Sequence, residues 1–162
     1  MERREYDATV LDLLLKRLKS NLRITSEDLD EELEHKLRAA IAYAEHQISQ
    51  VIVPSLFTVT EELGDRGIEL RSPLVSVDSV KSDDKDLVYT LNGVTLSPAV
   101  KKGSNVSVSY KAGMAEIPED IVFAICIKAS SMFEHPMDSV EVLNNASAKY
   151  LASYRNYPDG RS

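Results

Sequence analysis

The residues with the clearest capacity for chemistry lie between positions 31 and 46. Glu31 and His35 are four residues apart, which places both side chains on one face of a helix, and Glu34, Glu45 and His46 lie on the same stretch. A bound metal ion requires three or four converging ligands, which a two-residue pair at a helix surface seldom provides. We therefore interpret the pair as an exposed helix surface with i,i+4 contacts, and predict no metal and no other cofactor.

The sequence shows no pattern typical of catalysis. Cys126 is the single cysteine, so the chain alone forms neither a disulfide nor an all-cysteine metal site. It lies in the apolar stretch 121–127, where a cysteine is typical of the buried core. Gly113 lacks the glycine partners of a Walker loop or a dinucleotide-binding motif. Because no nucleophile–base pair or carboxylate pair is visible in the spacing, we predict that the chain is not an enzyme.

Charge is the second feature with functional meaning. The formal net charge is -7, and basic residues are scattered at positions 3–4, 16–19 and 101–102, which disfavours a grip on nucleic acid. An acidic run begins the second predicted helix; it comprises Glu27, Asp28, Asp30, Glu31, Glu32 and Glu34. Such a run stabilises a helix N-terminus, and it also repels passing DNA phosphates. The two interpretations overlap.

Helical periodicity predicts helices towards both ends of the chain. Leucines between Leu11 and Leu22 recur on one helical face and predict a helix over 7–22. An apolar stripe over 29–48 predicts a second helix, and the segment 25–28 resembles a capping box at its start. Pro118 is a suitable first residue for a third helix, and a fourth follows Pro136.

Between about 56 and 110 the apolar pattern becomes alternating, which predicts an insertion of four to six short strands. Asn92 and Gly93 form the residue pair of a tight hairpin turn. The predicted fold class is therefore α+β and mostly helical: N-terminal helices, a small antiparallel β-meander and two C-terminal helices. We predict a single domain over 1–162, with flexible tails at 1–9 and 156–162.

Three stretches in this order resemble the head-tail connector, or head-completion adaptor, proteins of tailed bacteriophages. The first is an acid-rich helix entry followed by an Ala-rich helix, at 30–45. The second, at 67–81, is a strand and a proline followed by a Val-Ser-Val strand. The third, at 106–125, is a last strand that leads through Ala-Gly into a helix begun by Pro118. Met114 stands where typical members of the family have an aromatic residue.

The resemblance implies a structural virion subunit, from a phage or a prophage, that is made in the host bacterial cytoplasm. Copies would form a ring of about twelve beneath the portal protein, through contacts between unlike faces. A tail-side completion protein would be the second neighbour, and DNA would pass through the channel without sequence-specific binding. No membrane partner is expected. The alternative is a DNA-binding or DNA-packaging-associated module.

Two sets of residues are candidates for contacts in such a particle. Tyr and Arg are enriched at interface hot spots, so for the portal contact we hypothesise Tyr150, Tyr154, Arg155, Tyr157 and Arg161. The alternative is that Tyr150 and Tyr154 form the buried face of the last helix. For a loop that reaches the channel or a neighbouring subunit we hypothesise Asp83, Asp84 and Lys85, although turn chemistry alone also explains these residues.

Overall fold

The computed structural model describes residues 1–135 and 144–155, which form two compact units. The β unit consists of Met1–Asp7 and Pro54–Met114, and it includes the predicted insertion at 56–110. The helical unit consists of Ala8–Val53 and the described residues from Ala115 onward. The α+β prediction is confirmed. The expectation of a mostly helical chain is not supported, because about 41% of the structure is helical and about 29% is strand.

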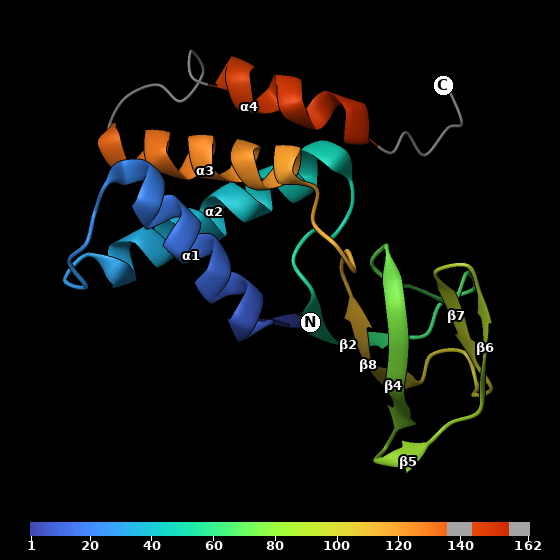
Figure 1. Ribbon diagram of the computed structural model, residues 1–162. Helices are drawn as coiled ribbons and strands as arrows, with labels where there is room; N and C mark the ends of the chain where they lie inside the picture. The colour runs from blue at the N-terminus through green and yellow to red at the C-terminus, as the bar shows by residue number, and fades with distance from the viewer. Residues whose placement is uncertain (136–143, 156–162) are drawn as a thin grey trace. The chain divides into compact units, whose positions relative to one another are not determined.

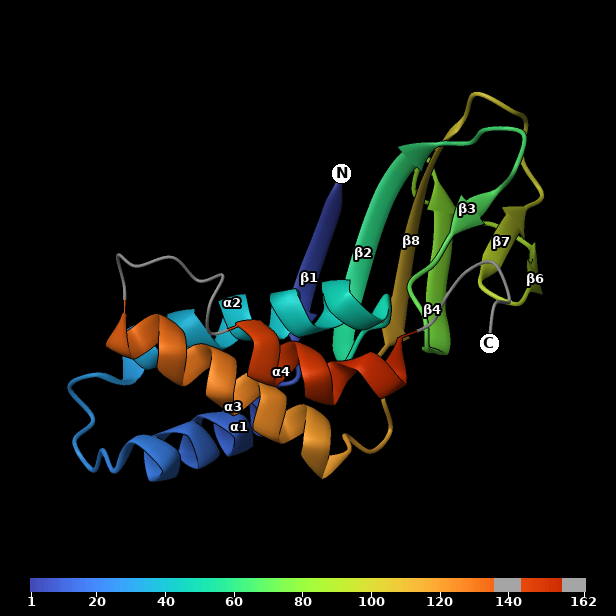
Figure 2. The same cartoon turned by 90° about the horizontal axis from the view of Figure 1, so that it is seen from above.

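The helical unit buries the apolar stripes that the sequence predicts. Its elements are α1 (Ala8–Leu22), α2 (Asp30–Ile48), α3 (Glu119–Glu134), α4 (Asn144–Leu151) and the short 3-10 helix η1 (Ala152–Tyr154). Leu14 and Leu18 of α1 and Leu33 and Leu37 of α2 are at most 1% exposed, and α4 lies alongside α3 (Figures 1 and 2). Within the described ranges, no helix combines the length and the apolar character that crossing a membrane requires.

The entry to α2 differs from the predicted capping box. Ser26 Oγ accepts a hydrogen bond from the Asp28 N–H (3.2 Å) and donates one to the Asp28 carboxylate (2.8 Å). The helix begins at Asp30, after Leu29, whose side chain makes no capping hydrogen bond. The Ser26 hydroxyl bonds to Asp28, two residues later, and therefore does not cap the helix that begins at Asp30. These polar residues instead form a turn between α1 and α2.

Glu45 organises the other end of α2. Its backbone carbonyl accepts hydrogen bonds from the N–H groups of Ser49 and Gln50, and Ser49 has the positive φ (57°) that is typical of a helix terminus. Its Oε1 atom accepts from the N–H groups of Ile52 (2.8 Å) and Val53 (3.3 Å), both in buried residues. Buried amides require acceptors inside the protein. The carboxylate that the sequence places near possible metal ligands thus closes the helix.

The β unit contains two antiparallel sheets rather than the predicted meander. Figure 2 shows β1 (Glu2–Tyr6), β2 (Ser55–Glu62), β8 (Asn105–Ala112) and β4 (Leu74–Ser82) side by side. Strand β5 (Lys85–Asp86), labelled in Figure 1, pairs with β4 at the end of this order. The second sheet has the order β3 (Ile68–Glu69), β7 (Thr95–Pro98), β6 (Tyr89–Asn92). Strand β2 pairs with β8 and not with the next strand along the chain, because this register stacks Phe57 on Tyr110 (5.3 Å between ring centroids) and pairs Val59 with Val108.

Within the predicted tail at 1–9, Glu2–Tyr6 forms the edge strand β1. The Met1 amino group donates to the Thr60 carbonyl (2.7 Å), and the Arg71 guanidinium binds both carboxylate oxygens of Glu2 (3.2 and 3.0 Å). Most side chains of β1 are charged, so the strand lacks the apolar alternation from which strands are predicted. The tail predicted at 156–162 lies outside the described residues.

The predicted hairpin is confirmed, with its turn shifted by one residue. Asn92 pairs with Thr95, so Gly93 and Val94 are the two central residues of the turn between β6 and β7. Gly93 has φ 61°, and a positive φ at the first central position is a common reason for glycine in a two-residue hairpin.

Candidate interaction surface

An exposed aromatic pair marks the surface of the helical unit. Phe123 of α3 and Tyr150 of α4 meet edge to face, with ring centroids 5.3 Å apart and an interplanar angle of 89°. The two residues are 48% and 41% exposed. Adjacent exposed aromatic side chains are typical of protein interfaces, where Phe and Tyr are enriched.

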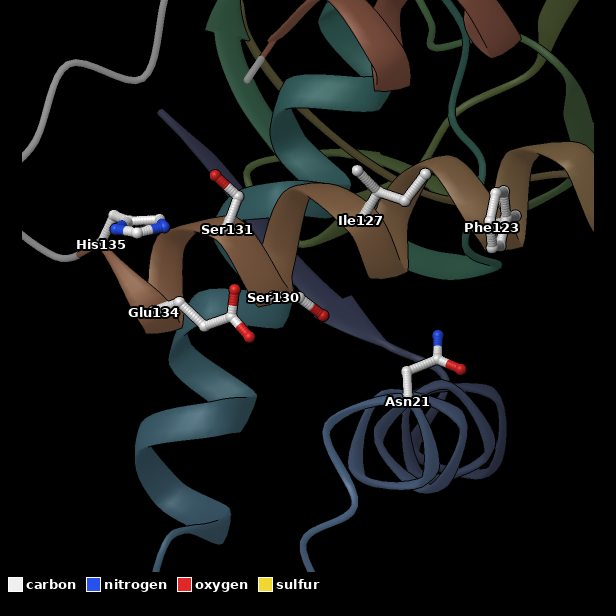
Figure 3. A pocket seen from close by; sticks show the side chains of 7 residues that line it. All are labelled: Asn21, Phe123, Ile127, Ser130, Ser131, Glu134 and His135. Carbon is white, nitrogen blue, oxygen red and sulfur yellow. The ribbon is translucent and has the colours of Figure 1, made fainter. Parts of the chain in front are cut away.

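Phe123 also lines an open groove of about 380 Å³ between the end of α1 and α3 (Figure 3). The other lining residues are Asn21, Ile127, Ser130, Ser131, Glu134 and His135. The spacing 123, 127, 130 and 134 describes one face of α3, with an apolar start and a polar end. Among the described residues, no side-chain hydrogen bond links His135 to either serine, so the groove shows no nucleophile–base pair. Phe123 and Ile127 give one end of the groove an apolar surface that an apolar side chain can contact, whereas the other end is polar.

Helix α4 presents Tyr150 outward. The buried face of α4 is formed by Ser147 and Leu151, each 0% exposed. The alternative that Tyr150 belongs to the buried face is therefore wrong: the residue is 41% exposed, and its ring meets the exposed ring of Phe123 on α3. Tyr150 thus extends the surface that Phe123 begins.

The other predicted portal residues occupy different surroundings. Tyr154 of η1 is half-buried, and Arg155 is exposed and donates from Nη2 to the Gln47 amide oxygen on α2 (2.8 Å). Tyr157 and Arg161 lie outside the described residues. The structure therefore groups Tyr150 with Phe123, which the sequence did not single out.

Asp83 and Asp84 form a two-residue turn between β4 and β5. Ser82 pairs with Lys85, and the two aspartates have φ values of 48° and 60°. A positive φ at both central positions is typical of tight hairpins, in which Asn-Gly is preferred. Asp83, Asp84 and Lys85 are exposed, and their contact with a channel or a neighbour stays a prediction.

Replacing this turn with Asp83→Asn and Asp84→Gly is expected to raise the free energy of unfolding by about 0.5–1 kcal/mol, because the relief of backbone strain exceeds the entropy that glycine adds to the unfolded chain. Asparagine and glycine adopt positive φ with less strain, and the change removes two adjacent carboxylates. Urea unfolding measures the effect, with Lys85→Gln as a control that leaves the turn conformation alone. A fall in stability would contradict this account of the turn.

Many basic side chains form ion pairs with carboxylates of their own unit. Examples are Arg3–Glu5, Lys16–Asp12, Arg17–Glu119, Lys19–Asp30 and Lys102–Asp65. A phosphate of a nucleic acid would have to displace these carboxylates before it could pair with the lysine and arginine side chains.

In the acidic run, Asp30–Glu32 form the first turn of α2, where their negative charge stabilises the helix. Glu31 and His35 are exposed, and no three His, Cys, Asp or Glu side chains converge within the part of the chain that the structure describes.

Cys126 lies in the core of the helical unit at 1% exposure, as predicted. Burial raises the pKa of its thiol to about 11, against a smaller lowering effect of Arg17.

At pH 8, labelling of the Cys126 thiol in the native protein is expected to be about 100-fold slower than labelling in urea, because the thiolate is the reactive form. The unfolded thiol ionises first, so this group's contribution to stability is complete below its ordinary pKa and is lost as the pH rises towards 11. Rapid labelling of folded protein would contradict a core position.

Lys128 is a buried cation that the sequence reading overlooked. The residue is 2% exposed, and its Nζ lies 4.2 Å from the ring centroid of Tyr43 on α2. Burial lowers the pKa of this amine. In the sequence, the sign of this position is that Lys128 is the single charged residue in the apolar run 121–129. The aromatic face of Tyr43 stabilises the ammonium group by a cation–π contact.

No family model and no curated protein matches the chain in sequence. Solved structures match it over 100% of both chains. A chain from the neck of a native gene transfer agent (GTA) particle computed with C12 symmetry has a TM-score of 0.71 at 17% identity. The neck of the empty particle, computed with C6 symmetry, contains a match with a TM-score of 0.69 at 17% identity, and the native virion one with 0.69 at 18%.

The chain shares the fold of these particle proteins. The likeness covers both units, including the edge strand β1 that the sequence did not predict. At this level of identity the comparison concerns the fold.

Proposed function

We propose that the chain is a structural neck protein of a phage-like particle: a head-tail connector or adaptor that forms a ring between portal and tail. The carrying observation is the full-length likeness to chains in GTA particle necks, two of which were computed with C6 and C12 symmetry. A ring of about twelve copies fits both symmetries. The proposed location is the head-tail junction of the virion, around the DNA exit channel.

Charge supports a role in which DNA passes without being held. The net charge is -7, and the ion pairs described above neutralise much of the positive charge locally. Tight phosphate binding depends on clustered lysine and arginine that displace counterions. A neck ring of this composition would therefore let DNA move through its centre.

The aromatic surface supports a protein contact on the helical unit. In this proposal Phe123 joins the portal contact hypothesised for Tyr150, Tyr154, Arg155, Tyr157 and Arg161. Docking of several copies on one portal raises the effective concentration of each neighbour, so weak contacts between copies suffice to close the ring. The turn formed by Asp83, Asp84 and Lys85 would face the channel or a neighbouring copy, and a tail-side completion protein would bind the assembled ring.

Capture by the cognate portal protein tests this function. Wild-type protein is expected to be retained on immobilised portal, and Tyr150→Ala to bind at least about 10-fold more weakly, as for a hot-spot residue. The matched control is Lys149→Ala, an exposed neighbour on α4. Lys149→Ala should unfold close to wild type, whereas Tyr150→Ala loses its contact with Phe123 and is expected to cost about 0.5–1.5 kcal/mol, so circular dichroism at the assay temperature verifies that both variants are folded.

Each other result has a clear meaning. Wild-type affinity of Tyr150→Ala would remove the aromatic surface from the portal contact. Failure of the wild-type chain to bind portal would remove the connector function. Tight, salt-dependent binding of duplex DNA would favour the alternative of a DNA-binding or packaging-associated module.

A further inference from the structure

The β unit carries an exposed apolar cluster on its edge strand β6. Tyr89 and Leu91 of β6 are 37% and 45% exposed, and Val88, just before the strand, is 79% exposed. Strand β6 ends the three-stranded sheet, so no further strand covers this side within the described chain. Tyr89 and Leu91 are two residues apart and so lie on one face, where they form a small exposed apolar patch, whereas Val88 lies on the opposite face.

The charge pattern around β6 distinguishes it from an ordinary exposed edge. No charged residue occurs over positions 87–100, although 28% of the chain is charged. At the edge of the other sheet, four of the five residues of β1 are Glu or Arg. Charged residues on an edge strand prevent unwanted pairing. The protein protects one edge in this way and leaves β6 uncharged, as expected of a surface that is covered after assembly.

The register shows which face of β6 carries the patch. Leu91 pairs with Leu96 and Tyr89 pairs with Pro98, and both partners are buried. Directly paired residues lie on the same face of a hairpin. Tyr89 and Leu91 therefore continue, onto the edge strand β6, the apolar face that Leu96 and Pro98 form on β7. Thr90, between them, lies on the opposite face and is also exposed.

A matching pocket lies on the five-stranded sheet of the same unit. It has a volume of about 280 Å³; apolar lining comes from Tyr6, Leu56, Val75 and Ala112, and charged lining from residues that include Glu5 and Lys111. Val75 is 63% exposed. A cavity of about 150 Å³ is enough to hold a benzene ring, so the pocket has room for the ring of one tyrosine. The phenol of Tyr89 combines an apolar ring with a hydroxyl that requires a polar partner, and Glu5 and Lys111 offer such partners.

We propose that Tyr89 and Leu91 of one copy dock into the pocket beside Val75 of a second copy. Each chain then carries both halves of the contact on different sheets. Contacts between unlike surfaces continue from copy to copy and generate rings when the rotation closes. An uncharged apolar strand does not match nucleic acid or a strongly charged partner, whereas the pocket of a second copy matches it in size and chemistry. This inference rests on the proposed ring and names the contact that builds it.

The first test compares Leu91→Lys with Thr90→Lys. Both add one ammonium group to the same strand, but only Leu91→Lys places it in the proposed contact, where burial without a partner is unfavourable. Sedimentation of the portal-bound or free multimer is expected to show at least about 10-fold weaker association for Leu91→Lys and wild-type association for Thr90→Lys. Circular dichroism verifies that both variants are folded. Equal association of the two variants would overturn the contact.

A second test identifies the partner surface by disulfide cross-linking. After oxidation, Val75→Cys combined with Tyr89→Cys is expected to give a ladder of covalent multimers, whereas neither single variant gives one. The native Cys126 does not interfere, because it is buried. Covalent dimers from Tyr89→Cys alone would show β6 pairing with itself and overturn the proposal. A multimer without a ladder overturns this contact alone, and the absence of any multimer overturns the ring as well.

Discussion

Glu45→Ala is expected to lower the free energy of unfolding by about 2–3 kcal/mol, the cost of removing a charged acceptor from a buried amide. The carboxylate accepts from the N–H groups of Ile52 (2.8 Å) and Val53 (3.3 Å), and the side chains of both residues are 0% exposed. Alanine leaves the Ile52 amide without this acceptor and releases the segment that follows α2. Chemical denaturation with a far-ultraviolet signal measures the loss.

Two variants make this result specific to the hydrogen bonds. Glu45→Gln keeps an oxygen acceptor and is expected to lose less than about 1 kcal/mol. Glu34→Ala removes a carboxylate from the same helix, where it forms an exposed ion pair with Arg38, and is expected to cost about 0.3–0.5 kcal/mol. Equal losses for Glu45→Ala and Glu34→Ala would show that the carboxylate of Glu45 does not close the helix.

Gly67→Ala is expected to destabilise the β unit by about 2–4 kcal/mol, from backbone strain combined with a steric clash. Gly67 has φ 74°, and a Cβ atom at this position would lie 2.6 Å from the Leu96 carbonyl oxygen. The contact involves backbone, so it is relieved only by shifting β3 away from β7. Thermal unfolding should show a clear decrease in the midpoint.

Gly64→Ala is the matched control for this prediction. A Cβ atom on Gly64 meets nothing within 4 Å, so the variant is expected to be neutral or more stable by up to about 1 kcal/mol, through reduced entropy of the unfolded chain. Similar midpoints for the two alanine variants would rule out the close approach of Gly67 to β7.

The helices were predictable because their information is local. The leucine spacing before position 22 and the stripe over 29–48 place α1 and α2 within a few residues of their observed bounds. The hydrogen bonds that close α2 were not predictable, because they depend on the Glu45 carboxylate reaching amides seven and eight residues later. No periodic pattern records such a contact.

Strand pairing depends on distant residues, which explains the main errors in the β unit. Phe57 and Tyr110 each lie in a segment with the expected apolar alternation, but their pairing joins strands β2 and β8, which are far apart in the sequence. Strand β1 lacks apolar alternation, since its stability comes from backbone pairing with β2 and from contacts such as Glu2–Arg71. Tertiary context decides these elements, as is general for β-structure.

The candidate surface was predictable only in part. Tyr150 was named from its residue type, but its neighbour Phe123 belongs to a helix whose pattern suggested core positions. Phe123 is nevertheless 48% exposed, which its place in the apolar stretch 121–127 does not show. The patch on β6 did leave a trace in the sequence, namely the uncharged segment 87–100.

The mass of the assembled species tests the central claim most directly. Native mass spectrometry over a concentration series, with and without the cognate portal, counts the 18.0 kDa copies in each complex. The neck-ring proposal predicts one closed multimer of about twelve copies, formed alone or on the portal. A chain that stays monomeric at every concentration and also on the portal would contradict it.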